Sequence, residues 1–161
     1  MNKPALLLIP VVIATCATML WWFSDSQLLK RKSQALVDCI NVTGNESRQY
    51  LMLKTNSFAN LLAEKVQCHV ELENHQANLS QEQLIEHHHL FVTNVGSSFI
   101  TADDFTVIMG DDNNATVDMS ISLNVTGKKG QQYSESGTLT LEWRKDQSDQ
   151  WGITVIDILS D

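Results

Sequence analysis

Basic residues, cysteines and catalytic motifs are all scarce in this sequence. The chain has 11 Lys and Arg against 19 Asp and Glu, and after residue 32 it has 7 against 18, a net charge of −11 for that part. An acidic domain repels a phosphate backbone, so we expect no nucleic-acid partner. No glycine-rich phosphate loop, CxxC pair or recognisable Ser-His-Asp arrangement is present. These absences favour a binding role over catalysis and predict no cofactor.

The three cysteines allow at most one intramolecular disulfide outside the N-terminal region. Cys16 lies inside a hydrophobic run, which leaves Cys39 and Cys68. In an exported domain a Cys39–Cys68 bridge would close a loop of about 30 residues and stabilise the fold by a few kcal/mol. The alternative is two buried thiols, because free cysteine is among the most buried residue types.

The one long hydrophobic run predicts a membrane anchor. Residues 5–23 follow Lys3 and contain no charged side chain. This length is close to the ~20 residues that cross a ~30 Å hydrocarbon core as a helix. The run ends in three aromatic residues, 21–23, which suit the boundary between lipid and water. We therefore expect a tail at residues 1–4, an uncleaved transmembrane signal anchor at residues 5–23 and a single-pass protein of the inner (cell) membrane.

Two other uses of this run, and its orientation, stay open. Residues 24–26 suit a signal-peptide cut before Gln27, and Cys16 lies in a stretch that resembles a lipobox. The basic residues 30–32 favour a cytoplasmic C-terminal domain by the positive-inside tendency. The resemblance of the run to an export signal favours the outside, so we expect the domain to be periplasmic or extracellular.

Helical spacing and capping residues predict three helices after the run. They are a first helix capped within Ser24–Ser26 and ending near residues 41–44, a second capped at Asn45 or Ser47 and ending near Lys65, and a third that begins with a Ser80–Gln83 capping box and ends at Gly96. The third helix carries three adjacent histidines, 87–89, whose side chains point about 100° apart and cannot close on one ion. We expect no metal site, and His88 packed against the core.

Alternation of apolar and polar residues predicts the strands. The first strand is predicted at residues 66–72, and from Phe105 onward the chain is predicted to be all strand. Within that region one strand includes residues 117–125 and a turn follows at residues 127–130. The next strand runs through Tyr133, Gly137, Leu139, Leu141 and Trp143, and the last covers residues 151–159. For residues 24–161 this order predicts an α+β domain with the N-terminal helices packed on a strongly curved antiparallel sheet.

The order of elements and the ending, Leu141–Arg144 with Gln150–Ile158, resemble the nuclear transport factor 2-like superfamily, a cystatin-like cone that includes ketosteroid isomerases and polyketide cyclases. The resemblance covers roughly residues 25–160. It implies a cone whose open end admits small apolar ligands. For membrane-anchored members it also implies an assembly role, with envelope protein partners and a homodimer formed through the sheet.

Two carboxylates are the candidate catalytic residues. Side chains alternate between the two faces of a strand, so residues an even number of positions apart share a face. By this parity Glu135 is expected to point inward with Leu139 and Leu141, and Asp157 to point inward with Ile153. A carboxylate that faces an apolar cavity could act as a general acid or base. The alternative places Glu135 at a solvated strand end and turns Asp157 outward through a bulge.

Two functional hypotheses follow. The first is a membrane-anchored, non-enzymatic binding or assembly module. The alternative is an exported enzyme or carrier that acts on a small apolar ligand in the cone, with Glu135 and Asp157 as its acids.

Overall fold

The computed structural model describes residues 21, 22, 24–70, 75–111 and 113–160. The expected anchor at residues 5–23 therefore lies almost entirely outside the described part. Within these ranges no helix has the length and apolar character that crossing a membrane requires.

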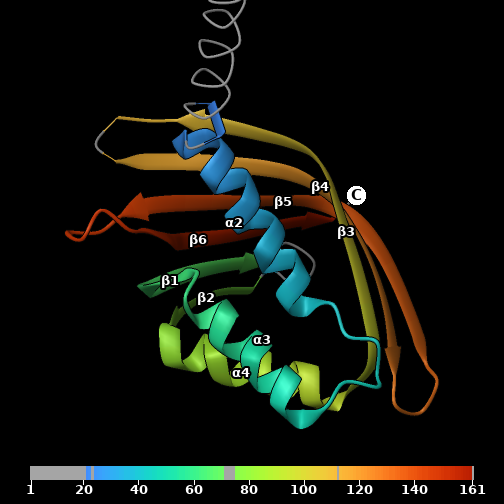
Figure 1. Cartoon of the computed structure of the whole chain (residues 1–161). Helices are drawn as coiled ribbons and strands as arrows, with labels where there is room; N and C mark the ends of the chain where they lie inside the picture. Colours follow the sequence, from blue (N-terminus) through green and yellow to red (C-terminus); the bar gives the residue numbers. More distant parts are fainter. Residues whose placement is uncertain (1–20, 23, 71–74, 112, 161) are drawn as a thin grey trace, which may run out of the picture.

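In the described part of the chain, three helices pack on one six-stranded sheet, with strand order β2-β1-β6-β5-β4-β3. In chain order the elements are α2 (Asp25–Ile40), α3 (Arg48–Ala59), β1 (Leu62–Val70), β2 (His75–Ser80), α4 (Gln81–Asn94), β3 (Val95–Met109), β4 (Asn114–Gly127), β5 (Gln132–Lys145) and β6 (Trp151–Ser160). Figure 1 shows α2 lying diagonally across the concave face of the sheet, with α3 and α4 side by side next to β1 and β2. The predicted α+β layers are confirmed.

Each helix begins at a serine that the sequence offers as a cap. The side chains of Ser24, Ser47 and Ser80 accept hydrogen bonds from backbone N–H groups three residues ahead. At Ser80 the capping box is complete, because Gln83 also accepts from the Ser80 backbone N–H. The predicted helix starts are thus confirmed.

The core lies between α2 and the inner face of the sheet. In the first half of β4 and the second half of β5 every second side chain is buried, as the alternation predicts. The largest of these is Trp143, which is 1% exposed and packs in one cluster with Leu29 and Ile153.

The sheet differs from the prediction in two respects. It is mixed and not antiparallel, because β1 runs parallel to β6 and pairs with it from Leu62↔Ile153 to Val70↔Ile158. It also has a second edge strand, β2, which was not predicted. An edge strand needs no run of apolar residues, and His75–Ser80 shows no clear alternation.

Several boundaries also differ from the prediction. The second helix ends at Ala59 and not near Lys65, so that β1 begins earlier, at Leu62. The third helix ends at Asn94, two residues before Gly96. β3 begins at Val95 and includes Gly96, whereas strand structure was predicted only from Phe105 onward.

His88 joins the three helices in a buried contact, and its predicted place against the core is confirmed. Its ring is 6% exposed and stacks on Phe58, with centroids 4.3 Å apart. Nε2 lies 3.1 Å from the Cys39 carbonyl oxygen, to which it must donate, and Nδ1 lies 3.3 Å from Thr55 Oγ1. Burial lowers the pKa of His88, and the nearby charges of His89 and Lys54 act in the same direction. The folded protein therefore favours the neutral ring.

This lowered pKa predicts a loss of stability in mild acid. The unfolded chain binds a proton at His88 as the pH falls through about 6.5, whereas the folded chain does not until a lower pH. The stabilisation is complete above pH about 6.5 and decreases below it, until the folded ring also titrates. Denaturant unfolding at several pH values should show a shallower decrease for His88→Gln than for the wild type. The variant His87→Gln, at an exposed neighbour, should keep the wild-type pH dependence, and equal profiles for all three proteins would contradict the prediction.

Candidate functional site

An apolar pocket of about 290 Å³ lies between the second half of α2 and the sheet. Leu36, Val37 and Ile40 of α2 form one wall. Side chains of β3, β4, β5 and β6 form the rest, with aliphatic residues such as Ile100, Ile121, Leu123, Leu139 and Ile158. This volume is at the lower end of the range for small-molecule sites.

The pocket exists because the strands are longer than the helix that covers them. Val117 and Met119 on β4 lie under α2 and are at most 1% exposed. Beyond the end of α2 at Ile40, the next inward residues of the same strand, Ile121 and Leu123, are only half-buried. Figure 1 shows β3, β4 and β5 curving past this end of the helix. The curved end of the sheet thus leaves apolar surface that none of the described elements covers.

Glu135 is the one charged residue among the described residues that line this pocket. It lies opposite Leu123 on the inner face of β5 and is half-buried. Tyr133, two residues earlier, lines the pocket and is 51% exposed. The structure therefore places Glu135 beside an apolar cavity, as its parity predicts.

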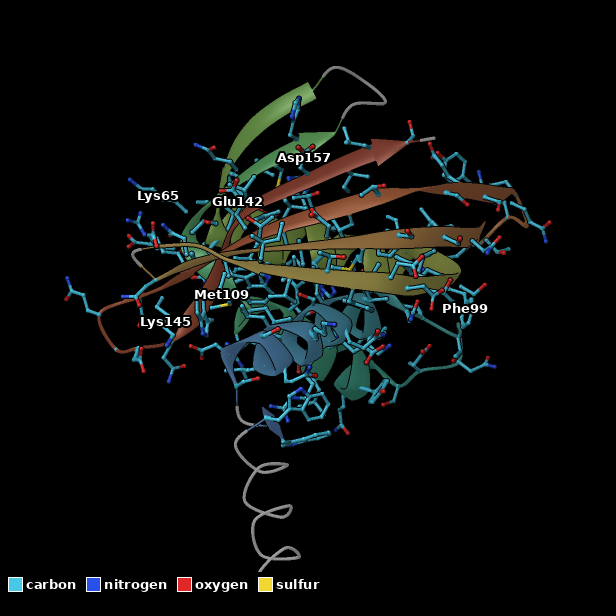
Figure 2. All side chains as sticks on the ribbon, turned by 90° about the horizontal axis from the view of Figure 1, so that it is seen from above. Lys65, Phe99, Met109, Glu142, Lys145 and Asp157 are labelled. Carbon is cyan, nitrogen blue, oxygen red and sulfur yellow. The ribbon has the colours of Figure 1, made fainter. Side chains whose placement is uncertain are left out.

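Asp157 lies on the opposite face of the sheet, so its predicted inward parity is wrong. Glu142 pairs with Val155 while Trp143 pairs with Ile153, which leaves Thr154 as an extra residue. This bulge reverses the parity of β6 and turns Asp157 outward, as Figure 2 shows. The structure therefore separates Glu135 from Asp157, and the bulge considered as an alternative is the correct interpretation.

On the outer face Asp157 lies close to His69. Its Oδ1 lies 3.7 Å from His69 Nδ1, an ion-pair distance that is too long for a hydrogen bond. Thr140, opposite Asp157 on β5, donates instead to Asp118 at 2.7 Å. Among the described residues no three His, Cys, Asp or Glu side chains lie close enough to hold one metal ion.

Larger hollows lie outside the apolar pocket. One of about 400 Å³ is lined by Glu142 and Arg144, and one of about 580 Å³ includes Asp146 and Trp151. A third, of about 390 Å³, lies beside Lys65 on β1. All three are more open to solvent than the apolar pocket, whereas ligand sites are mostly concave and apolar. We therefore take the smaller, more enclosed pocket as the candidate site.

Cys39 and Cys68 are free cysteines in the structure, so the bridge considered as one of two alternatives is not formed there. Cys39 lies on α2 within the core, and Cys68 lies on β1 and packs against the core. Burial raises the pKa of both thiols, which lowers their reactivity. Both side chains therefore act here as small apolar groups, as the alternative interpretation holds.

The start of α2 is held to the end of the sheet by contacts that the sequence did not predict. Trp151 Nε1 donates to Asp25 Oδ1 at 3.2 Å, and Lys145 Nζ lies 3.2 Å from Asp25 Oδ2. Lys32 Nζ donates to the Trp151 carbonyl oxygen at 2.8 Å. Figure 2 shows Lys145 at the end of the molecule where α2 begins. The helix that walls the pocket is thus fixed at its N-terminal end by residues more than one hundred positions away in the sequence.

Comparisons with known proteins identify the fold. No family model matches the chain, and no curated protein does. A nuclear transport factor 2-like superfamily protein from Salmonella enterica has a TM-score of 0.67 and 11% identity, covering 84% of this chain and 89% of that one. A protein with a cystatin-like fold from Caulobacter vibrioides has a TM-score of 0.64 and 12% identity, covering 83% and 87%. The association domain of CaMKII from C. elegans has a TM-score of 0.57 and 15% identity, covering 82% and 92%. The chain therefore has the nuclear transport factor 2-like fold.

Proposed function

We propose that this protein is a membrane-anchored, non-enzymatic binding module whose domain holds a small apolar ligand in the pocket under α2. The observation that carries the proposal is the concave pocket of about 290 Å³, with mostly aliphatic walls and a single charged residue, Glu135. Small-molecule sites are typically of this kind, with apolar walls and few polar groups that fix the orientation of the ligand.

A binding role is favoured over catalysis by the placement of the acids. General acid and base chemistry usually needs at least one further group that positions the reacting atoms or stabilises charge. Asp157, the second candidate, lies on the other face of the sheet. The enzyme alternative would therefore depend on Glu135, because it is the one charged side chain among the described residues of the pocket wall.

The proposed anchor is residues 5–23, with the domain outside the inner membrane. The support is the uncharged run itself and its place directly before α2, which begins at Asp25. Alkaline phosphatase fused after Asp161 should be active, and mass spectrometry should find Met1 or the residue after it at the N-terminus. Inactive phosphatase would move the domain to the cytoplasm, and an N-terminus near Gln27 would show a cleaved signal.

Binding is tested with isoleucine methyl NMR of the full chain in lipid nanodiscs. Ile40, Ile100, Ile121 and Ile158 line the pocket, whereas Ile108 is 57% exposed on β3 and lines none of its walls. Cyclohexylmethanol, a neutral and water-soluble apolar probe, should shift the four pocket methyl signals and leave Ile108 unchanged. Equal shifts everywhere, or none, would overturn the proposal.

A second proposal is assembly through the outer face of the sheet, with another copy or an envelope protein. It is favoured by short hydroxyl side chains that cover β4 and β5 there, with Ser122 Oγ 3.3 Å from Ser136 Oγ. The similar structures include an association domain. Sedimentation of the full chain over a hundredfold range of concentration should show a dimer. A monomer throughout would leave envelope partners as the remaining form of this proposal.

A further inference from the structure

The carboxylate of Glu135 makes no hydrogen bond or ion pair with any described residue. Its neighbours on β5, Ser134 and Ser136, point to the other face, where they contact Asn124 and Ser122. Other acids of the domain do have partners, such as Asp25 with Lys145 and Asp146 with two backbone N–H groups. A carboxylate beside an apolar wall is more stable when a donor or a cation pairs with it. Glu135 therefore offers an unused acceptor to a ligand.

Tyr133 adds a second group that suits a positive charge. It lies two residues before Glu135 on the same face of β5 and also lines the pocket. The face of a tyrosine ring attracts a cation. A charged nitrogen placed near both residues would leave the rest of a ligand among the aliphatic side chains of α2, β3 and β4.

The charges around the pocket disfavour an anionic ligand. None of the described residues that line it is Lys, Arg or His, and the chain has a net charge of −8. Of the two lysines in the β4–β5 turn, Lys128 donates to the Thr93 carbonyl oxygen on α4 and Lys129 is exposed. A fatty acid or a phosphate would therefore meet Glu135 without a compensating cation.

We infer that the pocket selects compact apolar amines, with the ammonium group paired to Glu135 and facing Tyr133. This inference rests on the proposed function, because it names the class of ligand for the same pocket. A volume of about 290 Å³ suits a compact hydrocarbon body and excludes a long lipid chain from full burial.

The test uses three probes of one shape: cyclohexylmethylamine, cyclohexylmethanol and cyclohexanecarboxylate. Their affinities are measured by titrating the pocket isoleucine methyl signals of the full chain in nanodiscs. We expect the amine to bind about tenfold more tightly than the alcohol, as a charge-assisted hydrogen bond allows, and the carboxylate to bind least. In Glu135→Gln the preference for the amine over the alcohol should disappear.

Two further variants separate the role of Glu135 from general charge and from folding. Glu142→Gln removes the same charge from the outer face of the same strand and should keep the tenfold preference. Tyr133→Leu should reduce the preference for the amine. If the alcohol binds but the amine binds no better, or if Glu135→Gln keeps the preference, the inference is overturned and the proposed function stands. If none of the probes shifts the pocket methyl signals, the proposed function itself fails.

Discussion

Replacing Trp143 by alanine is expected to lower the free energy of unfolding by about 3–5 kcal/mol, a large part of the total for a domain of this size. Trp143 is 1% exposed and lies at the centre of the layer between α2 and β5. Its ring also lies 5.9 Å below the ammonium group of Lys32, which donates to the Trp151 carbonyl oxygen. The cavity left by the indole would therefore weaken both the core and the attachment of α2. Denaturant unfolding measures the loss.

Trp143→Phe separates lost volume from lost polarity. The indole Nε1 is buried and makes no hydrogen bond to a described residue, and an unsatisfied buried donor costs about 1–3 kcal/mol. Phenylalanine removes this donor while it keeps most of the apolar volume. We expect Trp143→Phe to cost much less than Trp143→Ala. Equal losses for the two variants would show that Nε1 has a partner that matters more than packing.

The features that the sequence predicts well are those determined by neighbouring residues. A serine that caps a helix acts within three positions, so Ser80 could be predicted outright, and Ser24 and Ser47 were among the few candidates for the other two caps. Alternation along β4 and β5 also depends only on the strand itself. For the same reason the parity of Glu135 was predictable, and with it one residue of the candidate site.

The features that the sequence did not predict depend on partners far along the chain. The parallel pairing of β1 with β6 joins residues about ninety positions apart, and nothing local in either strand shows it. The bulge at Thr154 could be considered only as an alternative. Apolar residues occupy both alternating sets of positions in β6, so the sequence does not show which set faces inward after an extra residue. That single residue decides whether Asp157 lies on the inner or the outer face of the sheet.

The pocket itself could not be predicted from any one element. Its walls combine the last turns of α2 with inward residues of four strands, and it forms because α2 ends at Ile40 while the strands continue. A hydrophobic stripe in a sequence indicates a buried face, but it does not show where the covering helix stops. The attachment of α2 through Asp25, Lys145 and Trp151 was hidden for the same reason.

Gly137→Ala should displace part of the pocket wall and weaken ligand binding, while the domain stays folded. A Cβ added at Gly137 would overlap the Leu159 carbonyl oxygen and lie 3.1 Å from Ser160 Cα. Both contacts are backbone, so β6 would have to move. Gly137 forms the last pair of the β5–β6 ladder, with Ser160, and fraying of the strand end can relieve the overlap. We expect a loss of about 1–3 kcal/mol in unfolding free energy, as for other overpacked sites, with a shifted Ile158 methyl signal and weakened binding of cyclohexylmethylamine.

Gly110→Ala is the matched control, because it makes the same chemical change at a site with room for it. Its Cβ would meet Asn114 at 3.5 Å, an ordinary van der Waals contact. Stability and probe binding should stay close to wild type, with the small gain that alanine brings by restricting the unfolded chain where its conformation fits. If Gly137→Ala behaves like Gly110→Ala, then the end of β6 can move in the native protein. Leu159 and Ser160 would then not form a rigid wall of the pocket. Binding in the pocket would then depend on α2 and β3–β5 alone, which Leu36→Ala would test at the opposite wall.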